Sequence, residues 1–229
     1  MAHPIWPLFD LEVRTPRLTL RYVTDELATD LAELAAGGIH DTATMPFSVP
    51  WSDVAPPELG HNTMQYIWRR RAQTTPSAWT IEFAVVVDDV TIGTSGLSGT
   101  DFARLRQTTT DSWLGREFQG QGFGKEMRLA MLALAFDGFD ADRAITSAWH
   151  DNAASIGVTT SLGYTETGRR WMLRREQPDV LVEFEMPREH FASLRRDDIT
   201  LHGVDAAREL LQTERVRSVS GSVPPPSSA

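Results

Sequence analysis

The most informative segment of the chain reads Gln119-Gly120-Gln121-Gly122-Phe123-Gly124-Lys125 and lies between a strand-like run and a long apolar helix pattern. Glycines on alternate positions let the backbone fold tightly and bring its N–H groups close to an anion. The helix that begins there adds four unpaired N–H groups and the positive end of its dipole. We therefore predict that this segment, the glycine loop, binds a phosphate.

The composition narrows the class of protein. With 229 residues and a hydrophobic fraction of 41%, the chain is long and apolar enough for one domain with a sizeable core. A net charge of -9 argues against nucleic acid as the main ligand, because binding phosphates along a strand needs clustered Lys and Arg. The absence of cysteine excludes disulfides, thiolate metal sites and thiol nucleophiles, and we expect no metal. No apolar run approaches a membrane span and no signal pattern opens the chain, so we expect a cytoplasmic protein without a membrane partner.

Residue periodicity predicts an ordered series of helices and strands on both sides of the glycine loop. The expected elements are a strand at 17–23, a helix capped by Thr24, an irregular loop at 38–57, a helix at about 58–73, strands at 79–87, 90–98 and 108–114, a helix from 122 to about 137, a strand at 144–149, a helix capped by Asp151-Asn152 that ends at Gly163, and strands near 164–173 and 180–186. This order indicates an α/β fold of the α+β kind, with a mixed sheet that is antiparallel in its N-terminal meander.

We expect a single domain over residues 1–215. Its core lies at about 13–186, and a C-terminal extension follows at 187–215. Within the extension, the segment around Ile199–Leu211 is strand-like and then helical, and it is our candidate for the contacts of a homodimer. The tail at 216–229 is rich in Ser and Pro, a composition that predicts disorder.

The spacing of the glycines excludes two familiar phosphate sites. The dinucleotide fingerprint requires Gly-x-Gly-x-x-Gly within a parallel βαβ unit, whereas the spacing from Gly120 is Gly-x-Gly-x-Gly and the preceding strand belongs to a meander. A P-loop is excluded because no Gly-Lys-Ser/Thr closes the motif. The pattern that fits is Gln/Arg-x-x-Gly-x-Gly/Ala, formed by Gln119, Gly122 and Gly124.

This pattern resembles the signature of the GNAT acyltransferase superfamily, and other motifs add to the resemblance. The segments Asn152-Ala153-Ala154-Ser155 and Leu162-Gly163-Tyr164 are similar to the family's second signature, an Asn-initiated helix that ends in a Leu-Gly-aromatic turn. The segments Thr15-Pro16-Arg17-Leu18-Thr19-Leu20-Arg21 and Ser112-Trp113-Leu114-Gly115 are similar to the branch that contains the ribosomal-protein N-terminal acetyltransferases. The match covers about residues 13–186 in the expected order.

The resemblance implies that the phosphate belongs to coenzyme A, with acetyl-CoA or another acyl-CoA as cosubstrate. In the family, the pantetheine arm lies where two parallel strands splay, here those around 108–114 and 144–149, and its amides satisfy the unpaired backbone groups. A main-chain N–H near Leu114 is then expected to bind the thioester oxygen. The expected coenzyme A-binding residues are Trp113, Leu114, Arg116, Gln119, Gly120, Gln121, Gly122, Phe123, Gly124, Lys125, Asn152 and Ser155. Among them, Arg116 and Lys125 are expected to help neutralise the phosphates.

Acyl transfer to an amine requires a neutral amine, a route for its proton and protonation of the leaving thiolate. Since the chain has no cysteine, direct attack in a ternary complex is the simplest mechanism. Many family members use a Tyr seven residues after the helix-initiating Asn, where this chain has Thr159. The ribosomal-protein branch resembles this chain in placing a Ser three residues after it, so Ser155 is the candidate acid. Its other interpretation is a helix-start Ser bonded to its own backbone. Asn152 is expected to act as a helix cap, as a coenzyme A partner or as both.

The candidate general base is Asp111, on the strand just before the Ser-Trp-Leu segment. Strand alternation places Asp111 and Trp113 on one face. The alternative is that Asp111 is an acid exposed to water. Asp101, His40 and His150 are further candidates, as is a water relay without a dedicated base.

The acceptor pocket is expected in the irregular loop, with Phe47, Trp51 and His40 as substrate-binding residues and with Trp113 nearby. The branch resemblance favours a protein or peptide amine, while a lysine or a small amine stays open. A dicarboxylic donor such as succinyl-CoA needs a cation near the thioester, for which Arg104, Arg106 and Arg170 are the candidates.

Two other classes of function stay open at this point. A non-catalytic acyl-CoA sensor or interaction module on the same fold is the main alternative, because the usual Tyr is replaced by Thr159. A nucleotide-dependent oxidoreductase is the third. Measured release of free thiol from acetyl-CoA separates an acyltransferase from a binder.

Overall fold

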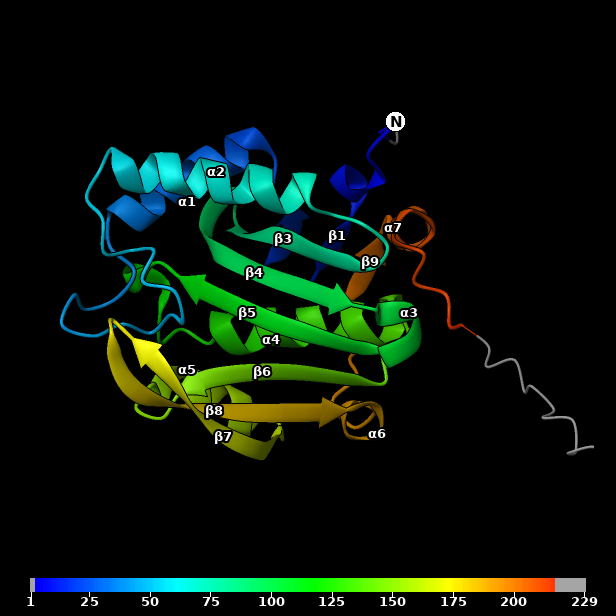
Figure 1. The fold of residues 1–229 in the computed structure, drawn as a ribbon. Coiled ribbons are helices and arrows are strands. Elements are labelled where there is room, and N and C mark those ends of the chain that lie inside the picture. Colours follow the sequence, from blue (N-terminus) through cyan, green and yellow to red (C-terminus); the bar gives the residue numbers. More distant parts are fainter. Residues whose placement is uncertain (1–2, 217–229) are drawn as a thin grey trace, which may run out of the picture.

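A computed structural model describes residues 3–216 (Figure 1). Of the predicted tail at 216–229, only Val216 is described, and its N–H donates to the Ala103 carbonyl; positions 217–229 lie outside the described residues. No helix between residues 3 and 216 is long and apolar enough to cross a membrane.

The described residues form one nine-stranded sheet in the order β7-β8-β6-β5-β4-β3-β2-β1-β9. Its strands are β1 (Glu12–Arg14), β2 (Thr19–Tyr22), β3 (Ala78–Val87), β4 (Val90–Thr100), β5 (Gln107–Leu114), β6 (Arg143–Trp149), β7 (Thr165–Arg174), β8 (Gln177–Pro187) and β9 (Thr200–His202). Only β5 and β6 are parallel neighbours, while the other neighbouring strands run antiparallel. The predicted mixed sheet with an antiparallel N-terminal meander is therefore confirmed.

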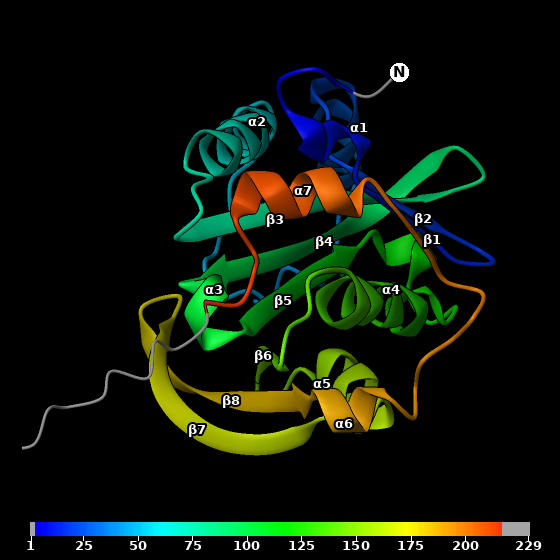
Figure 2. The same cartoon turned by 90° about the vertical axis from the view of Figure 1, so that its right-hand side faces the viewer.

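Helices cover both faces of this sheet (Figure 2). They are α1 (Asp25–Ala36), α2 (Glu58–Ala72), α3 (Phe102–Leu105), α4 (Phe123–Ala133), α5 (Ala153–Ser161), α6 (Arg188–Phe191) and α7 (Val204–Leu211), with a π-helical turn at Leu134–Gly138 and 3-10 turns at Pro7–Asp10 and Arg116–Phe118. Helices α1 and α2 pack on one face, against alternate residues of β3 that include Ala84 and Val86. Helix α4 packs on the opposite face.

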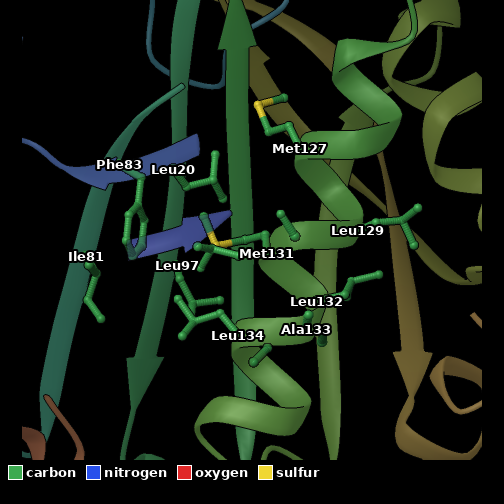
Figure 3. Close-up of a cluster of buried hydrophobic side chains, with 14 of the residues drawn as sticks. Leu20, Ile81, Phe83, Leu97, Met127, Leu129, Met131, Leu132, Ala133 and Leu134 are labelled. Atoms are coloured by element: carbon green, nitrogen blue, oxygen red, sulfur yellow. The ribbon is translucent and has the colours of Figure 1, made fainter. Parts of the chain in front are cut away.

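The main core lies between α4 and the central strands (Figure 3). Met127, Met131 and Leu134 extend from α4 and are almost completely buried together with Phe83 of β3 and Leu97 of β4. These residues recur at helical spacing on α4 and at alternate positions on the strands, which explains why periodicity predicted both kinds of element. The core thereby fixes the start of α4, where the glycine loop ends, against the ends of the central strands.

The C-terminal extension belongs to the same fold. Strand β9 pairs with β1 at the edge of the sheet, and Ala207 and Leu211 of α7 are buried in the core of this chain. The segment predicted to be strand-like and then helical has that structure, although its contacts are intramolecular. The homodimer stays a prediction.

Candidate active site

The site is built around the only parallel strand pair among the described residues, which separates after three paired positions. Gln107–Thr109 pair with Arg143–Ile145, and the hydroxyl of Thr146 then donates to the Thr110 carbonyl at 3.0 Å. Beyond this point β5 stays paired with β4, and β6 stays paired with β8, so the two strands diverge (Figure 1). The splay predicted for these strands is therefore present, and its narrow end lies at Thr110 and Thr146.

The main chain of β5 offers hydrogen-bonding groups to this splay. The Gly115 N–H donates to the Ile92 carbonyl on β4, and in an antiparallel ladder every second residue does the same. Trp113 and Asp111 therefore direct their main-chain groups to β4, whereas Leu114 and Ser112 direct theirs toward β6. The N–H groups of Ser112 and Leu114 are thus the donors that a ligand in the splay can reach, and Trp113 contributes none.

The glycine loop joins the end of β5 to α4. Gly120 and Gly122 have φ of +72° and +84°, a region that only glycine adopts without strain, while Gly124 lies outside it. The first intrahelical bond runs from the Glu126 N–H to the Gly122 carbonyl, so the N–H groups of the preceding helical residues precede the hydrogen-bonded ladder. The geometry at the helix start is that of an anion site.

Side chains tie the glycine loop to the rest of the fold. The Gln119 amide donates to the carbonyls of Leu114 and Ile39, both at 2.8 Å, so this side chain closes the loop. Lys125 is exposed in the first turn of α4 and donates to the Ser161 carbonyl at 3.4 Å. Arg116 is also exposed, beside Gly38.

The sequence interpretation missed a cation at this loop. Arg17 donates to the Gln121 carbonyl at 3.1 Å and to Glu126 at 2.6 Å, and its guanidinium lies 4.8 Å from the centre of the Phe123 ring. Although burial acts to raise the pKa of Glu126, hydrogen bonds from Thr15 and Arg17 leave it lowered. The sequence held one indication of this role, because Arg17 belongs to the segment 15–21 that resembles the family. That resemblance did not reveal where the Arg17 side chain lies.

The start of α5 carries the two residues of the second motif. The Asn152 side-chain oxygen accepts a hydrogen bond from the Ser155 N–H at 3.1 Å and caps the helix. The Ser155 side chain is half-buried in the first turn. The helix-cap interpretation of Asn152 is therefore correct, and this capping does not use the hydroxyl of Ser155.

The irregular loop brings the predicted acceptor residues together. Ring centres are 5.5 Å apart for His40 and Phe47, 5.1 Å for Phe47 and Trp51, and 5.8 Å for Trp51 and Trp113. Both ring nitrogens of His40 have partners, because Nδ1 donates to the Asp41 carbonyl at 2.8 Å and Nε2 then accepts from the Ser52 hydroxyl at 2.7 Å. These aromatic side chains line the α1/α2 face of the splay.

The same loop is fastened to the far side of the splay. The Trp149 indole of β6 donates to the Phe47 carbonyl at 3.0 Å, and Arg174 of β7 donates to the Met45 carbonyl at 2.7 Å. Arg175 forms an ion pair with Asp53 at 2.6 Å. The loop therefore spans from the α1/α2 side to the β7–β8 hairpin.

Asp111 lies on the α1/α2 face and leans over Gly96 of β4. A Cβ built on Gly96 would lie 2.7 Å from its Oδ1, so the carboxyl occupies the space that this glycine leaves open. Asp111 keeps access to solvent, while protein atoms surround it on its other sides. The protein atoms that crowd the carboxyl remove part of its hydration and so raise the pKa of Asp111, and the charges of Arg70 and Arg128 act in the opposite direction.

Glu82 is a second carboxylate on this face, and the sequence interpretation did not single it out. It is 5% exposed on β3 and accepts a hydrogen bond from the Tyr66 hydroxyl of α2 at 2.6 Å. Burial and the nearby charge of Asp111 raise the pKa of Glu82 to about 8. A signal was available, because Glu82 interrupts an otherwise apolar strand with a charge.

Arg128 is a buried cation of α4 that the sequence interpretation also missed. It is 4% exposed, and its Nε and Nη1 have no hydrogen-bond partner within residues 3–216. It follows Gly124 by one turn, and that side of α4 faces Leu114 of β5 and Val158 of α5. Its guanidinium lies 6.0 Å from the centre of the Tyr164 ring.

Other candidates from the sequence lie elsewhere or have other partners. Asp101 follows the end of β4 beside the start of β5, at the opposite end from the splay. His150 pairs with Asp179 at 3.1 Å. None of the three arginines considered for an acyl carboxylate lies at the splay: Arg104 is exposed on α3, Arg106 is buried against the carbonyls of Phe139, Asp140 and Thr213, and Arg170 pairs with Glu183 on the outer hairpin.

A splayed parallel strand pair followed by a glycine loop at a helix start is the arrangement that the family resemblance implied. A family model described as an acetyltransferase (GNAT) domain matches residues 17–165. The chain belongs to the GNAT acetyltransferase family. The family assignment supports an acyl-CoA-dependent N-acyltransferase, with an acyl-CoA as cosubstrate.

Solved structures share this GNAT fold. One is by its name a candidate ribosomal-protein-serine acetyltransferase of Vibrio cholerae, with 18% identity, a TM-score of 0.61 and coverage of 78% of this chain and 98% of that chain. Another is RimL, named as a ribosomal α-N-protein acetyltransferase and solved with coenzyme A, with 15% identity, a TM-score of 0.64 and coverage of 77% and 97%. The spermidine/spermine N-acetyltransferase SpeG of Vibrio cholerae has 13% identity, a TM-score of 0.61 and coverage of 78% and 98%.

Proposed function

We propose that this GNAT protein transfers an acyl group from acyl-CoA to a primary amine by direct attack in a ternary complex. The observation that carries the proposal is the splay between β5 and β6, whose wide end meets the glycine loop after Leu114 and the irregular loop with Phe47 and Trp51. The pyrophosphate binds the start of α4, and the pantetheine arm pairs with the main chain of Ser112 and Leu114. The N–H of one of these residues binds the thioester oxygen.

The reaction needs only proton transfers from the protein. The amine nitrogen attacks the thioester carbon, the C–N bond forms, and the C–S bond breaks. Asp111 takes the proton that the amine loses, and Ser155 gives a proton to the departing thiolate and regains one from water. His40 is a poorer base, because both of its ring nitrogens are engaged.

The acceptor is proposed to be a protein or peptide amine. It reaches the thioester past His40, Phe47 and Trp51, on the face where Asp111 lies. RimL and SpeG acetylate, by their names, a ribosomal protein and a polyamine, so a lysine or small amine is the matched comparison in an assay.

Release of free thiol tests this function. Acetyl-CoA, butyryl-CoA and succinyl-CoA are incubated with the protein and with a peptide N-terminus, a lysine peptide or a polyamine. We expect thiol release that depends on one amine, with the acylated amine seen by mass spectrometry. Tight acyl-CoA binding without turnover on any amine supports the alternative function instead, a non-catalytic sensor or interaction module on this fold.

Arg128 supports a donor whose acyl group carries a carboxylate. Two buried guanidinium nitrogens without a hydrogen-bond partner among the described residues are costly, and a carboxylate at the end of a succinyl group supplies a partner. The Arg128→Met variant is expected to lower kcat/KM for succinyl-CoA about tenfold or more relative to butyryl-CoA, the neutral donor of equal chain length. An unchanged ratio of the two kcat/KM values contradicts this role. The other acyl-CoA donors then stay open.

Ser155→Ala tests the proposed acid. Loss of the hydroxyl leaves the thiolate to be protonated by water, so kcat is expected to fall about tenfold or more while the Kd for acyl-CoA barely changes. Ser161→Ala is the matched control, because Ser161 lies at the other end of α5 and its hydroxyl donates to the Val158 carbonyl at 2.9 Å. Equal turnover in the two variants rejects the role of Ser155.

A further inference from the structure

Two carboxylates lie on the strands that flank β4, on the same face of the sheet, with a glycine of β4 between them. Gly96 of β4 stands directly opposite Glu82 of β3 on one side and Asp111 of β5 on the other. The Asp111 carboxyl already fills the space above Gly96, with Oδ1 at 2.7 Å and Oδ2 at 2.9 Å from a Cβ placed there. The absence of a side chain at Gly96 thus lets Asp111 lean toward Glu82.

The two carboxyls differ in what surrounds them. Glu82 is buried and forms no ion pair with a Lys or Arg of residues 3–216, and the one hydrogen bond to its carboxyl from these residues comes from Tyr66. Asp111 is exposed to solvent, two residues before Trp113 on the same face of β5. Burial and the charge of Asp111 together raise the pKa of Glu82 to about 8, so Glu82 mostly keeps its proton at neutral pH.

The other charged and titratable groups around the pair come from three elements. Arg70 of α2 lies 5.0 Å from the centre of the Tyr66 ring, and its charge acts on both carboxyls. Arg128 of α4 acts on Asp111 from the other face of the sheet. Tyr22 of β2 lies within range of the Glu82 charge. These cations favour one negative charge on the pair, and the two carboxylates repel when both are ionised.

We propose that Glu82 is a positioning residue that shares a proton with Asp111, so that the two carboxyls work as one acid–base unit. The role rests on the proposed function, in which Asp111 takes the proton of the amine. Protonated Glu82 donates a hydrogen bond that holds the Asp111 carboxylate over Gly96. The amine's proton then leaves through the solvent-facing Asp111, because Glu82 has no exposed path.

Proton sharing is measured directly by carbon-13 NMR of labelled Glu and Asp carboxyls in the protein without acyl-CoA. We expect one Glu carboxyl to titrate near pH 8 in the parent protein and this step to vanish in Glu82→Gln. In Asp111→Asn the repelling charge is lost, so the step should move down by at least about one pH unit. A Glu82 step that stays in place in Asp111→Asn overturns the pair, as does the absence of a step above pH 6.

Gly96→Ala provides a test that removes no titratable group. The added methyl displaces the Asp111 carboxyl, which is the end of a flexible side chain, and the φ of Gly96 lies outside the left-handed region, so the fold is expected to survive. The Glu82 step should again move down. Circular dichroism checks the fold, and a Glu82 step unchanged from that of the parent contradicts the convergence over Gly96.

Steady-state kinetics of Glu82→Gln separate the positioning role of Glu82 from the proposed acyltransferase function. Glu82→Gln keeps the shape of the side chain and its acceptor for Tyr66, so a purely structural role predicts parent kinetics. We expect instead a fall of kcat/KM of about tenfold with little change in acyl-CoA Kd, and a double variant with Asp111→Asn no worse than Asp111→Asn alone. Glu166→Gln, an exposed carboxyl on β7, is the control with unchanged kinetics. If the losses of kcat/KM from Glu82→Gln and Asp111→Asn add in the double variant, the shared role is wrong. If NMR shows the coupled titration but the protein turns over no amine, only the proposed function is wrong.

Discussion

Asp111→Asn is expected to lower kcat/KM about a hundredfold at neutral pH while leaving the Kd for acyl-CoA nearly unchanged. The amide has the shape of the carboxylate but cannot take a proton from the amine. The main-chain groups of residue 111 bond to β4 in either case, so the splay and the donor site keep their structure. Initial rates with varied amine, together with acyl-CoA binding by calorimetry, check the expectation.

The size of this loss should depend on pH in a defined direction. Below its pKa the amine arrives as an ammonium and must lose one proton before it can attack, in addition to the proton that it loses as the amide forms. The deficit of Asp111→Asn is therefore largest below the pKa of the amine, about 8 for a peptide N-terminus and about 10 for lysine, and shrinks above it. Burial raises the pKa of Asp111 itself, so the activity of the parent protein should fall on the acid side at a higher pH than an ordinary Asp would give.

Asp101→Asn is the matched control for this variant. The sequence made both acids candidates, but Asp101 follows the end of β4 away from the splay, and its left-handed backbone conformation suits Asn equally well. Parent kinetics are expected for Asp101→Asn. If Asp111→Asn also retains activity within about twofold, a water relay replaces the dedicated base.

Gly122→Val is expected to raise the Kd for acyl-CoA by about ten- to a hundredfold. Gly122 has φ of +84°, where a β-branched side chain is strained by at least about 1–2 kcal/mol, and a Cβ there would lie 3.3 Å from the Arg17 guanidinium. Relief of that strain turns the loop and misdirects the N–H groups at the start of α4. Calorimetric titration with coenzyme A measures the change.

Gly124→Ala is the control within the same loop. Its φ lies outside the left-handed region, and an added Cβ meets Val158 at 3.7 Å and Leu114 at 3.9 Å, which are ordinary contacts. We expect coenzyme A affinity close to that of the parent. Equal affinities of Gly122→Val and Gly124→Ala for coenzyme A would show that the loop does not bind the pyrophosphate.

The order and type of most elements could be predicted because their causes are local. Thr24 caps α1 by accepting a hydrogen bond from the Leu27 N–H, and Asp88 and Asp89 adopt the positive φ that a tight hairpin turn requires. The short β1, α3 and α6 were missed, because three or four residues carry too little periodicity to be detected. Strand β9 was foreseen as strand-like, but its pairing with β1 depends on residues almost 190 positions apart, which no local pattern encodes.

Some parts of the candidate site could likewise be predicted from local sequence, and others could not. The glycine loop and the cap at Asn152 are encoded in short contiguous segments, so their positions were predicted residue by residue. Arg17, Arg128 and the approach of Glu82 to Asp111 depend on which strands become neighbours and which face of a helix turns inward. A charged residue such as Glu82 in an apolar strand indicates that some partner exists. It does not identify that partner, because Asp111 lies on a strand two places away in the sheet.

The sequence by itself determined the family and the position of the glycine loop, because glycine spacing, helix caps and strand alternation act over a few residues. The tertiary structure alone decided which charged groups meet. Strand register placed Glu82 and Asp111 on either side of Gly96, and the packing of α4 left Nε and Nη1 of Arg128 buried without a hydrogen-bond partner among residues 3–216. The physical reason is that burial and charge pairing are properties of positions in space, and those positions are fixed only when distant segments of the chain pack together.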